Sequence, residues 1–83
     1  MARYKAAFTD RILEEMKKLD RRQRQLVYKR IGKILEMPEL GKPLHAPLNN
    51  YKSERMEKHR IVYKVVGSTV VFAWLEHRKH VYE

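Results

Sequence analysis

The chain has 83 residues, of which 19 are Lys or Arg and 10 are Asp or Glu, so its formal net charge is +9. This length fits one small domain, residues 1–83, and a hydrophobic content of 43% excludes a disordered tail. The absence of cysteine excludes disulfides, thiolate metal sites and a cysteine nucleophile. Since the chain shows no membrane-length apolar run and no signal peptide, we expect a cytoplasmic protein whose partner is a polyanion, either a nucleic acid or an acidic protein.

The first half of the sequence predicts a short strand followed by two helices. Residues 4–8 alternate weakly and predict the strand, and residues 9–10 can cap the start of a helix. Asp20, with Gln23 three residues later, is typical of the start of a second helix, which Pro and Gly within residues 37–41 should end. Two helices joined so tightly are expected to run antiparallel, as a helical hairpin.

The second half of the sequence has the pattern of β-structure. Residues 40–50 are rich in Gly, Pro and Asn and predict a loop, and residues 51–56 predict a weak strand. Residues 59–66 and 69–75 are rich in β-branched and aromatic side chains and predict two strong strands. Gly67-Ser68 between them suits a two-residue hairpin turn.

These elements predict an α+β fold with an N-terminal strand, an antiparallel two-helix hairpin and a three-stranded antiparallel meander. The sheet has to cover the apolar stripes of both helices, so the helices should pack on one face and leave the other at least partly open. Arg60 alternates with Ile61 and Tyr63, and we therefore expect it on the open face.

The residues that could carry chemistry are basic and lie in the second half. A metal site is not expected, because His77 and His80 are the only close histidine pair and two ligands do not make a site. No nucleotide-binding motif occurs, so no cofactor is expected. A better set contains several cations, a histidine and a tyrosine that could hold a phosphate and stabilise its transition-state charge: Lys52, Arg55, Arg60, Arg78, His80 and Tyr82.

For RNA, such a site needs no metal, because the 2′-hydroxyl can attack the adjacent phosphate and His80 could transfer protons. A structural interpretation competes with this one. Charged residues that alternate along a half-exposed strand commonly form its solvent face, and Arg55 and Arg60 could simply pair with a glutamate across the sheet.

Four segments of the second half together resemble the RelE/ParE superfamily of toxins from type II toxin–antitoxin systems. The resemblance covers residues 41–82 as a pattern and the whole chain as an order of elements. The matching segments are Gly41-Lys42-Pro43-Leu44, Tyr51-x-Ser53-x-Arg55, His59-Arg60-Ile61-Val62-Tyr63-x-Val65 and His77-Arg78-x-x-Val81-Tyr82.

The resemblance implies a ribosome-dependent endoribonuclease that cuts mRNA in the A site by metal-independent 2′-hydroxyl attack. It implies catalytic roles for Arg60, Arg78 and Tyr82, and Lys52 falls near the family's catalytic lysines. In the similar YoeB-like branch a near-terminal histidine is the acid, which His80 fits. The resemblance and the charge pattern together imply RNA or phosphate contacts for Arg55, Lys64, His77 and Lys79.

The general base stays open, because the acidic loop residue of the YoeB-like branch has no match in this chain. Lys52, His80 and His77 are candidates, and the chain could also lack a base. The alternative functions are a ParE-like toxin that inhibits DNA gyrase without catalysis and an inactive RNA-binding relative. The implied partners are a cognate antitoxin, whose acidic segment would cover the basic face, together with ribosomal RNA and mRNA.

Overall fold

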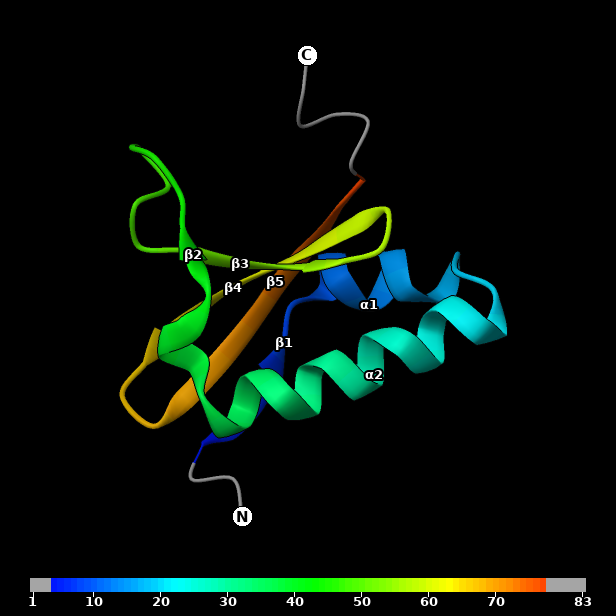
Figure 1. Ribbon diagram of the computed structural model, residues 1–83, viewed down its shortest axis with the longest axis horizontal. Helices are drawn as coiled ribbons and strands as arrows, with labels where there is room; N and C mark the ends of the chain where they lie inside the picture. Colours follow the sequence, from blue (N-terminus) through cyan, green and yellow to red (C-terminus); the bar gives the residue numbers. More distant parts are fainter. Residues whose placement is uncertain (1–3, 78–83) are drawn as a thin grey trace.

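The computed structural model describes residues 4–77, which form two helices and a five-stranded sheet (Figure 1). In chain order the elements are β1 (Lys5–Phe8), α1 (Asp10–Lys17), α2 (Arg21–Glu36), the 3₁₀ turn η1 (Pro38–Leu40), β2 (Lys42–Pro43), β3 (Lys52–Met56), β4 (His59–Val66) and β5 (Thr69–His77). The predicted α+β fold is confirmed, with the strands and helices in the expected order.

The strands lie side by side in the order β1-β5-β4-β3-β2. β1 pairs with β5 in parallel, whereas β2, β3, β4 and β5 pair antiparallel in sequence. β2 was not predicted, because its two residues lie in the segment expected to be a loop. Lys42 and Pro43 nevertheless pair with Ser53 and Lys52 and extend the sheet by a short edge strand.

Side-chain caps start both helices, as the sequence predicts. The Thr9 hydroxyl accepts a hydrogen bond from the Ile12 amide at 3.1 Å, and the Asp20 carboxylate accepts one from the Gln23 amide at 2.8 Å. These bonds satisfy backbone amides that have no partner within the first helical turn. Neither α1 nor α2, the helices of the described chain, combines the length and apolarity needed to cross a bilayer.

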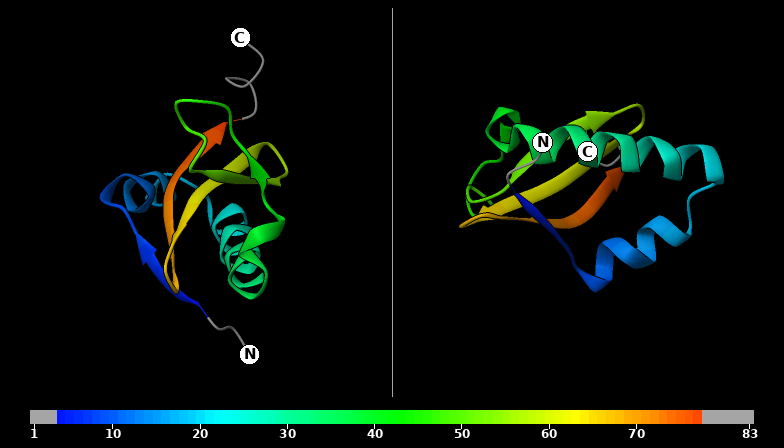
Figure 2. Two further views of the ribbon diagram at one scale, coloured as in Figure 1. Left: turned by 90° about the vertical axis from the view of Figure 1, so that its left-hand side faces the viewer. Right: turned by 90° about the horizontal axis from the view of Figure 1, so that it is seen from below.

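The two helices pack their apolar residues against one face of the sheet, which we call the covered face. The chain reverses direction between α1 and α2, but the two helices diverge from their connecting turn as a V instead of lying along each other (Figure 2, right). The core between helices and sheet contains Ile12, Met16, Val27, Ile31, Ile34, Met56, Ile61, Tyr63, Val70, Phe72 and Leu75.

The edge of β5 is completed by α1 beyond the end of β1. β1 stops at Phe8, which is opposite Phe72, so later residues of β5 have no strand partner on that side. The Thr9 hydroxyl donates to the Ala73 carbonyl, and the Glu15 carboxylate accepts from the Leu75 amide at 2.7 Å. Two side chains therefore take the place of backbone partners that a longer β1 would have supplied.

Tyr63 links β4 to the turn after α2. Its ring is fully buried, and its hydroxyl donates to the Pro38 carbonyl at 2.7 Å. Burial, followed by the Glu54 charge, raises the pKa of Tyr63 to about 12. The hydroxyl also occupies the space where a Cβ at position 41 would stand, which explains why the chain carries Gly41 there.

We expect Tyr63→Phe to lower the free energy of unfolding by about 1–3 kcal/mol, because the buried Pro38 carbonyl loses its partner. Tyr28→Phe is the matched control. Because Tyr28 is 56% exposed, this variant should lower the free energy of unfolding by no more than about 0.5 kcal/mol.

The raised pKa of Tyr63 also predicts a pH effect on stability, because the unfolded chain releases the Tyr63 proton at lower pH than the folded chain. Stability should therefore fall between pH 10 and about 12 in the wild type and fall less in Tyr63→Phe. Urea unfolding at pH 7 and pH 11 measures both effects, and equal urea midpoints at pH 7 for the wild type and Tyr63→Phe would contradict the assigned hydrogen bond.

Candidate functional site

The face of the sheet opposite the core, which we call the open face, is defined by the strand register. Directly opposed residues on neighbouring strands place their side chains on the same face, and successive residues alternate. Ile61 and Tyr63 belong to the core, so Arg60, Val62 and Lys64 project from the open face of β4. This confirms the side predicted for Arg60.

Three charged residues cross the open face in a row. Arg60 lies opposite Arg55 on β3 and opposite Glu76 on β5. Among residues 4–77 no ion pair within 4.0 Å involves any of the three, so the competing interpretation of a cross-strand ion pair finds no support there. Two arginines directly opposite each other repel, and an anion bound between them would relieve that repulsion.

A shallow depression of about 400 Å³ lies on the β2 side of this row. Arg55 and Arg60 contribute to its lining together with Lys42 from β2. Its remaining lining residues are Leu40, Ser53 and Glu54. The depression therefore offers three cations around a space that could receive a phosphate group.

Two aromatic rings lie beside the charged row, each with a cation over it. The ring centroids of Tyr51 and Trp74 are 5.2 Å apart, and Trp74 is opposite Val62 on the open face. The Arg11 guanidinium carbon lies 5.0 Å from the Trp74 ring centroid, and Lys64 Nζ lies 5.4 Å from that of Tyr51. We call these four residues the aromatic cluster.

The structure separates two predicted residues from Arg60. Lys52 is opposite Tyr63, so the register places it on the covered face, and the possibility that β3 brings it beside Arg60 is excluded. The reason is the register of β3, which the weak pattern of that strand could not define. His77 is opposite His59, one residue along from the Arg60 row, and the same alternation turns it away from the open face.

Arg55, Arg60 and Lys64 thus share the open face, on which the sequence predicted Arg60. Four other predicted site residues, Arg78, Lys79, His80 and Tyr82, lie outside the described residues. Within residues 4–77 no three His, Asp or Glu side chains group as metal ligands would.

The sequence interpretation missed four residues of the open-face site. Glu76 was considered only as an ion-pair partner. Its place on the open face follows from its pairing with Arg60, which the sequence alone does not show. The sequence interpretation gave no site role to Trp74 or to Tyr51. Arg11 completes the aromatic cluster from α1, and no sequence signal pointed to it.

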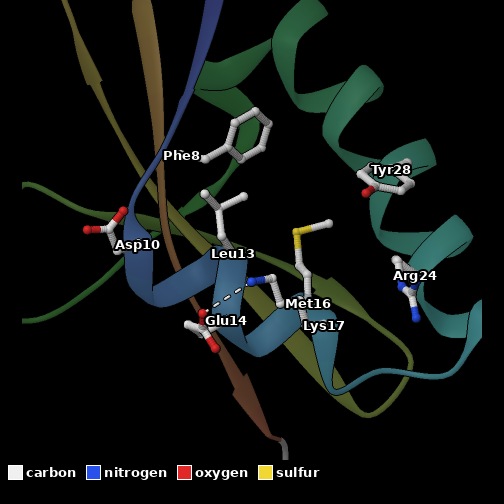
Figure 3. A pocket seen from close by; sticks show the side chains of 8 residues that line it. All are labelled: Phe8, Asp10, Leu13, Glu14, Met16, Lys17, Arg24 and Tyr28. Carbon is white, nitrogen blue, oxygen red and sulfur yellow. Dashed lines mark hydrogen bonds and ion pairs between the residues drawn. The ribbon is translucent and has the colours of Figure 1, made fainter.

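A separate groove of about 560 Å³ opens between α1, α2 and β1, away from the open face (Figure 3). Its exposed apolar residues are Phe8, Leu13 and Tyr28, which are 39%, 45% and 56% exposed. Figure 3 shows Phe8 and Leu13 on one side and Tyr28 on α2 across from them. The groove contains none of the residues predicted for the site.

Comparisons with known proteins agree with the resemblance found in the sequence. No model of a protein family matches the chain. A protein of Methanocaldococcus jannaschii named "Putative toxin RelE4" is 27% identical over 77 residues, which cover 89% of this chain and 82% of that protein.

Solved structures show the same relationship in three dimensions. A chain of the toxin–antitoxin complex RelBE2 from Mycobacterium tuberculosis is 29% identical, with a TM-score of 0.84 and 94% of each chain covered. The isolated Escherichia coli RelE toxin is 26% identical, with a TM-score of 0.76, and the match covers 95% of this chain and 90% of that one. The sequence and the fold of the chain are therefore both similar to those of RelE-type toxins.

The histidine pair at the end of β4 and β5 predicts a pH effect on stability. The rings of His59 and His77 are 5.1 Å apart, and the pKa of His59 is lowered from 6.5 by burial first and by His77 second. The folded chain therefore binds a proton at His59 less readily than the unfolded chain, and its stability should fall as the pH drops below 6.5. Urea midpoints at pH 7 and pH 5 measure the fall, which His59→Gln should reduce. An unchanged fall in that variant would show that other groups cause it.

Proposed function

We propose that this chain, whose sequence and fold resemble those of RelE/ParE-superfamily toxins, is a ribosome-dependent endoribonuclease that acts at the open face of its sheet. The observation that carries the proposal is the row Arg55, Arg60 and Glu76, which places two cations and a carboxylate side by side on three adjacent strands. This arrangement supplies charge stabilisation and a proton acceptor, which cleavage by a 2′-hydroxyl requires.

The proposed reaction is an internal transfer at one phosphate of the RNA. Glu76 accepts the proton of the 2′-hydroxyl, and the resulting oxygen attacks the adjacent phosphorus. Arg60 and Arg55 stabilise the negative charge that builds up on the non-bridging oxygens. The bond to the 5′-oxygen breaks, that oxygen takes up a proton, and the products are a 2′,3′-cyclic phosphate and a 5′-hydroxyl.

The proposal assigns Glu76 as the general base that the sequence left open. Lys52 is a weaker candidate for this role because the register places it on the covered face. His80 is proposed as the acid that protonates the leaving oxygen, and Arg78 and Tyr82 as further members of the site. These three assignments rest on the family pattern, since the residues lie outside the described chain.

The proposed partners are mRNA, ribosomal RNA and an antitoxin. The formal net charge of +9 favours RNA as a partner. A structural neighbour that is 29% identical comes from a toxin–antitoxin complex, which supports an antitoxin as the protein partner. We propose that an acidic segment of the antitoxin covers Arg55, Arg60 and Lys64, because opposite charge would guide it to the open face.

The test is cleavage of an mRNA programmed into the A site of 70S ribosomes, with the ends mapped by primer extension. We expect discrete cuts that a 2′-deoxy nucleotide at the cleaved position abolishes, since it removes the nucleophile. Arg60→Ala should reduce the cleavage rate about 10²- to 10³-fold. Glu76→Gln should reduce it about 10²- to 10⁴-fold.

Arg21→Ala is the matched control, because Arg21 is an exposed arginine of α2 outside the proposed site. Circular dichroism should show that all three variants stay folded. Full cleavage by folded Arg60→Ala would refute the site. Absence of cuts by wild-type protein that is folded and bound to the ribosome would instead favour a non-catalytic toxin, and gyrase inhibition would be tested next.

The antitoxin proposal predicts where binding protects the toxin. Hydrogen exchange of the complex should slow at β3, β4 and β5, and affinity should fall as salt is raised, because screening weakens the charge attraction. Arg55→Glu should weaken the complex more than Arg21→Glu does. Protection confined to α1, α2 and β1 would place the antitoxin in the groove of Figure 3 and contradict the proposal.

A further inference from the structure

We infer that the aromatic cluster of Tyr51, Trp74, Arg11 and Lys64 is a stacking site for a base of single-stranded RNA. The inference deepens the proposed function and rests on it, because it assigns the place of a base next to the phosphate that is cut. Trp74 and Arg11 lie outside the matching segments, and Tyr51 lies in one of them without an assigned role, so the assignment comes from the geometry of the cluster.

The position of the cluster relative to the charged row suits one nucleotide. Trp74 precedes Glu76 by two residues on β5, and Val62 follows Arg60 by two on β4, so the two rows are adjacent on the same face. Two strand residues span about 7 Å. A base at Trp74 and a phosphate at Arg60 can therefore belong to the same or neighbouring nucleotides.

The two rings are held by the backbone around them. Tyr51 donates its amide hydrogen to the Leu48 carbonyl and accepts at its own carbonyl from the Leu44 amide, at 2.9 and 3.0 Å. Trp74 lies in the pairing of β4 with β5. The fixed backbone and the contact between the two rings limit the conformational entropy that they lose on binding, which is an advantage for a stacking surface.

The two cations over the rings can leave the ring faces and contact phosphate when RNA binds. Arg11 Nε donates a hydrogen bond to Glu15 Oε2 at 3.2 Å, and the same carboxylate accepts one from the amide of Leu75, the residue after Trp74. The Arg11 side chain is nevertheless 63% exposed, so its exposed ion pair is weak. A base can take its place against Trp74 while the guanidinium moves to the adjacent phosphate, and Lys64 can do the same beside Tyr51.

The competing explanation is that Tyr51 and Trp74 only shield Val62, which is fully buried on the open face although it is absent from the main core. Shielding requires apolar area alone and gives no role to the two cations. It also predicts that RNA bases leave the rings unaffected, and fluorescence can measure this directly.

Trp74 is the single tryptophan of the chain, so its fluorescence reports on the cluster without a mutation. The probe is a short single-stranded RNA with 2′-O-methyl groups, which cannot be cut by internal attack. The control probe is an abasic oligonucleotide of the same length and charge. We expect the RNA to quench Trp74 emission at saturation and the abasic chain to bind without quenching.

Variants separate stacking from shielding. Tyr51→Leu should raise the Kd for the RNA about 5- to 150-fold, whereas Tyr51→Phe should keep it within about 3-fold, because stacking needs the ring and not the hydroxyl. Tyr28→Leu is the matched control, since it removes an exposed aromatic ring from the other side of the molecule and should leave the Kd unchanged.

Equal quenching by both probes, no quenching by an RNA shown to bind by anisotropy, or no RNA binding at all would each overturn the inference. Its failure is distinguishable from failure of the proposed function. Base-dependent quenching without ribosomal cleavage would support the stacking site and refute the nuclease, whereas cleavage without quenching would do the reverse.

Discussion

The register of β4 against its two neighbours determines which side chains meet on each face of the sheet. β-Strands alternate with a period of two, so the pairing that sends Ile61 and Tyr63 into the core also sends Arg60 and Lys64 to the open face. A slip by one residue would exchange the two sets and bury charge in place of the Tyr63 ring. The high free energy of the slipped pairing stabilises the observed register, and that register also fixes which charged residues lie on the open face.

The two faces also separate the groups that stabilise the fold from those of the proposed site. The buried hydrogen bond of Tyr63 and the apolar core lie on the covered face, whereas Arg55, Arg60 and Glu76 project from the other. The opposed arginines repel and contribute nothing favourable to the fold by themselves. The open face therefore carries charges that the fold tolerates because its core supplies the stability elsewhere.

Most of the fold could be predicted because its signals are local. The caps at Thr9 and Asp20 and the turn at Gly67-Ser68 depend on a few neighbouring residues, and the structure has each of them. The face of Lys52 could not be predicted, because alternation within one strand does not say how that strand aligns with the next. Arg11 could not be predicted at all, since its contact with Trp74 depends on where α1 packs.

The two side chains that complete the edge of β5 also protect the molecule from its own copies. An uncovered strand edge is a template on which a second chain can add a strand, and such addition leads to aggregation. Thr9 and Glu15 occupy the Ala73 carbonyl and the Leu75 amide that an incoming strand would need. Two hydrogen bonds from α1 and its cap thus protect this edge from strand addition by a second copy of the chain.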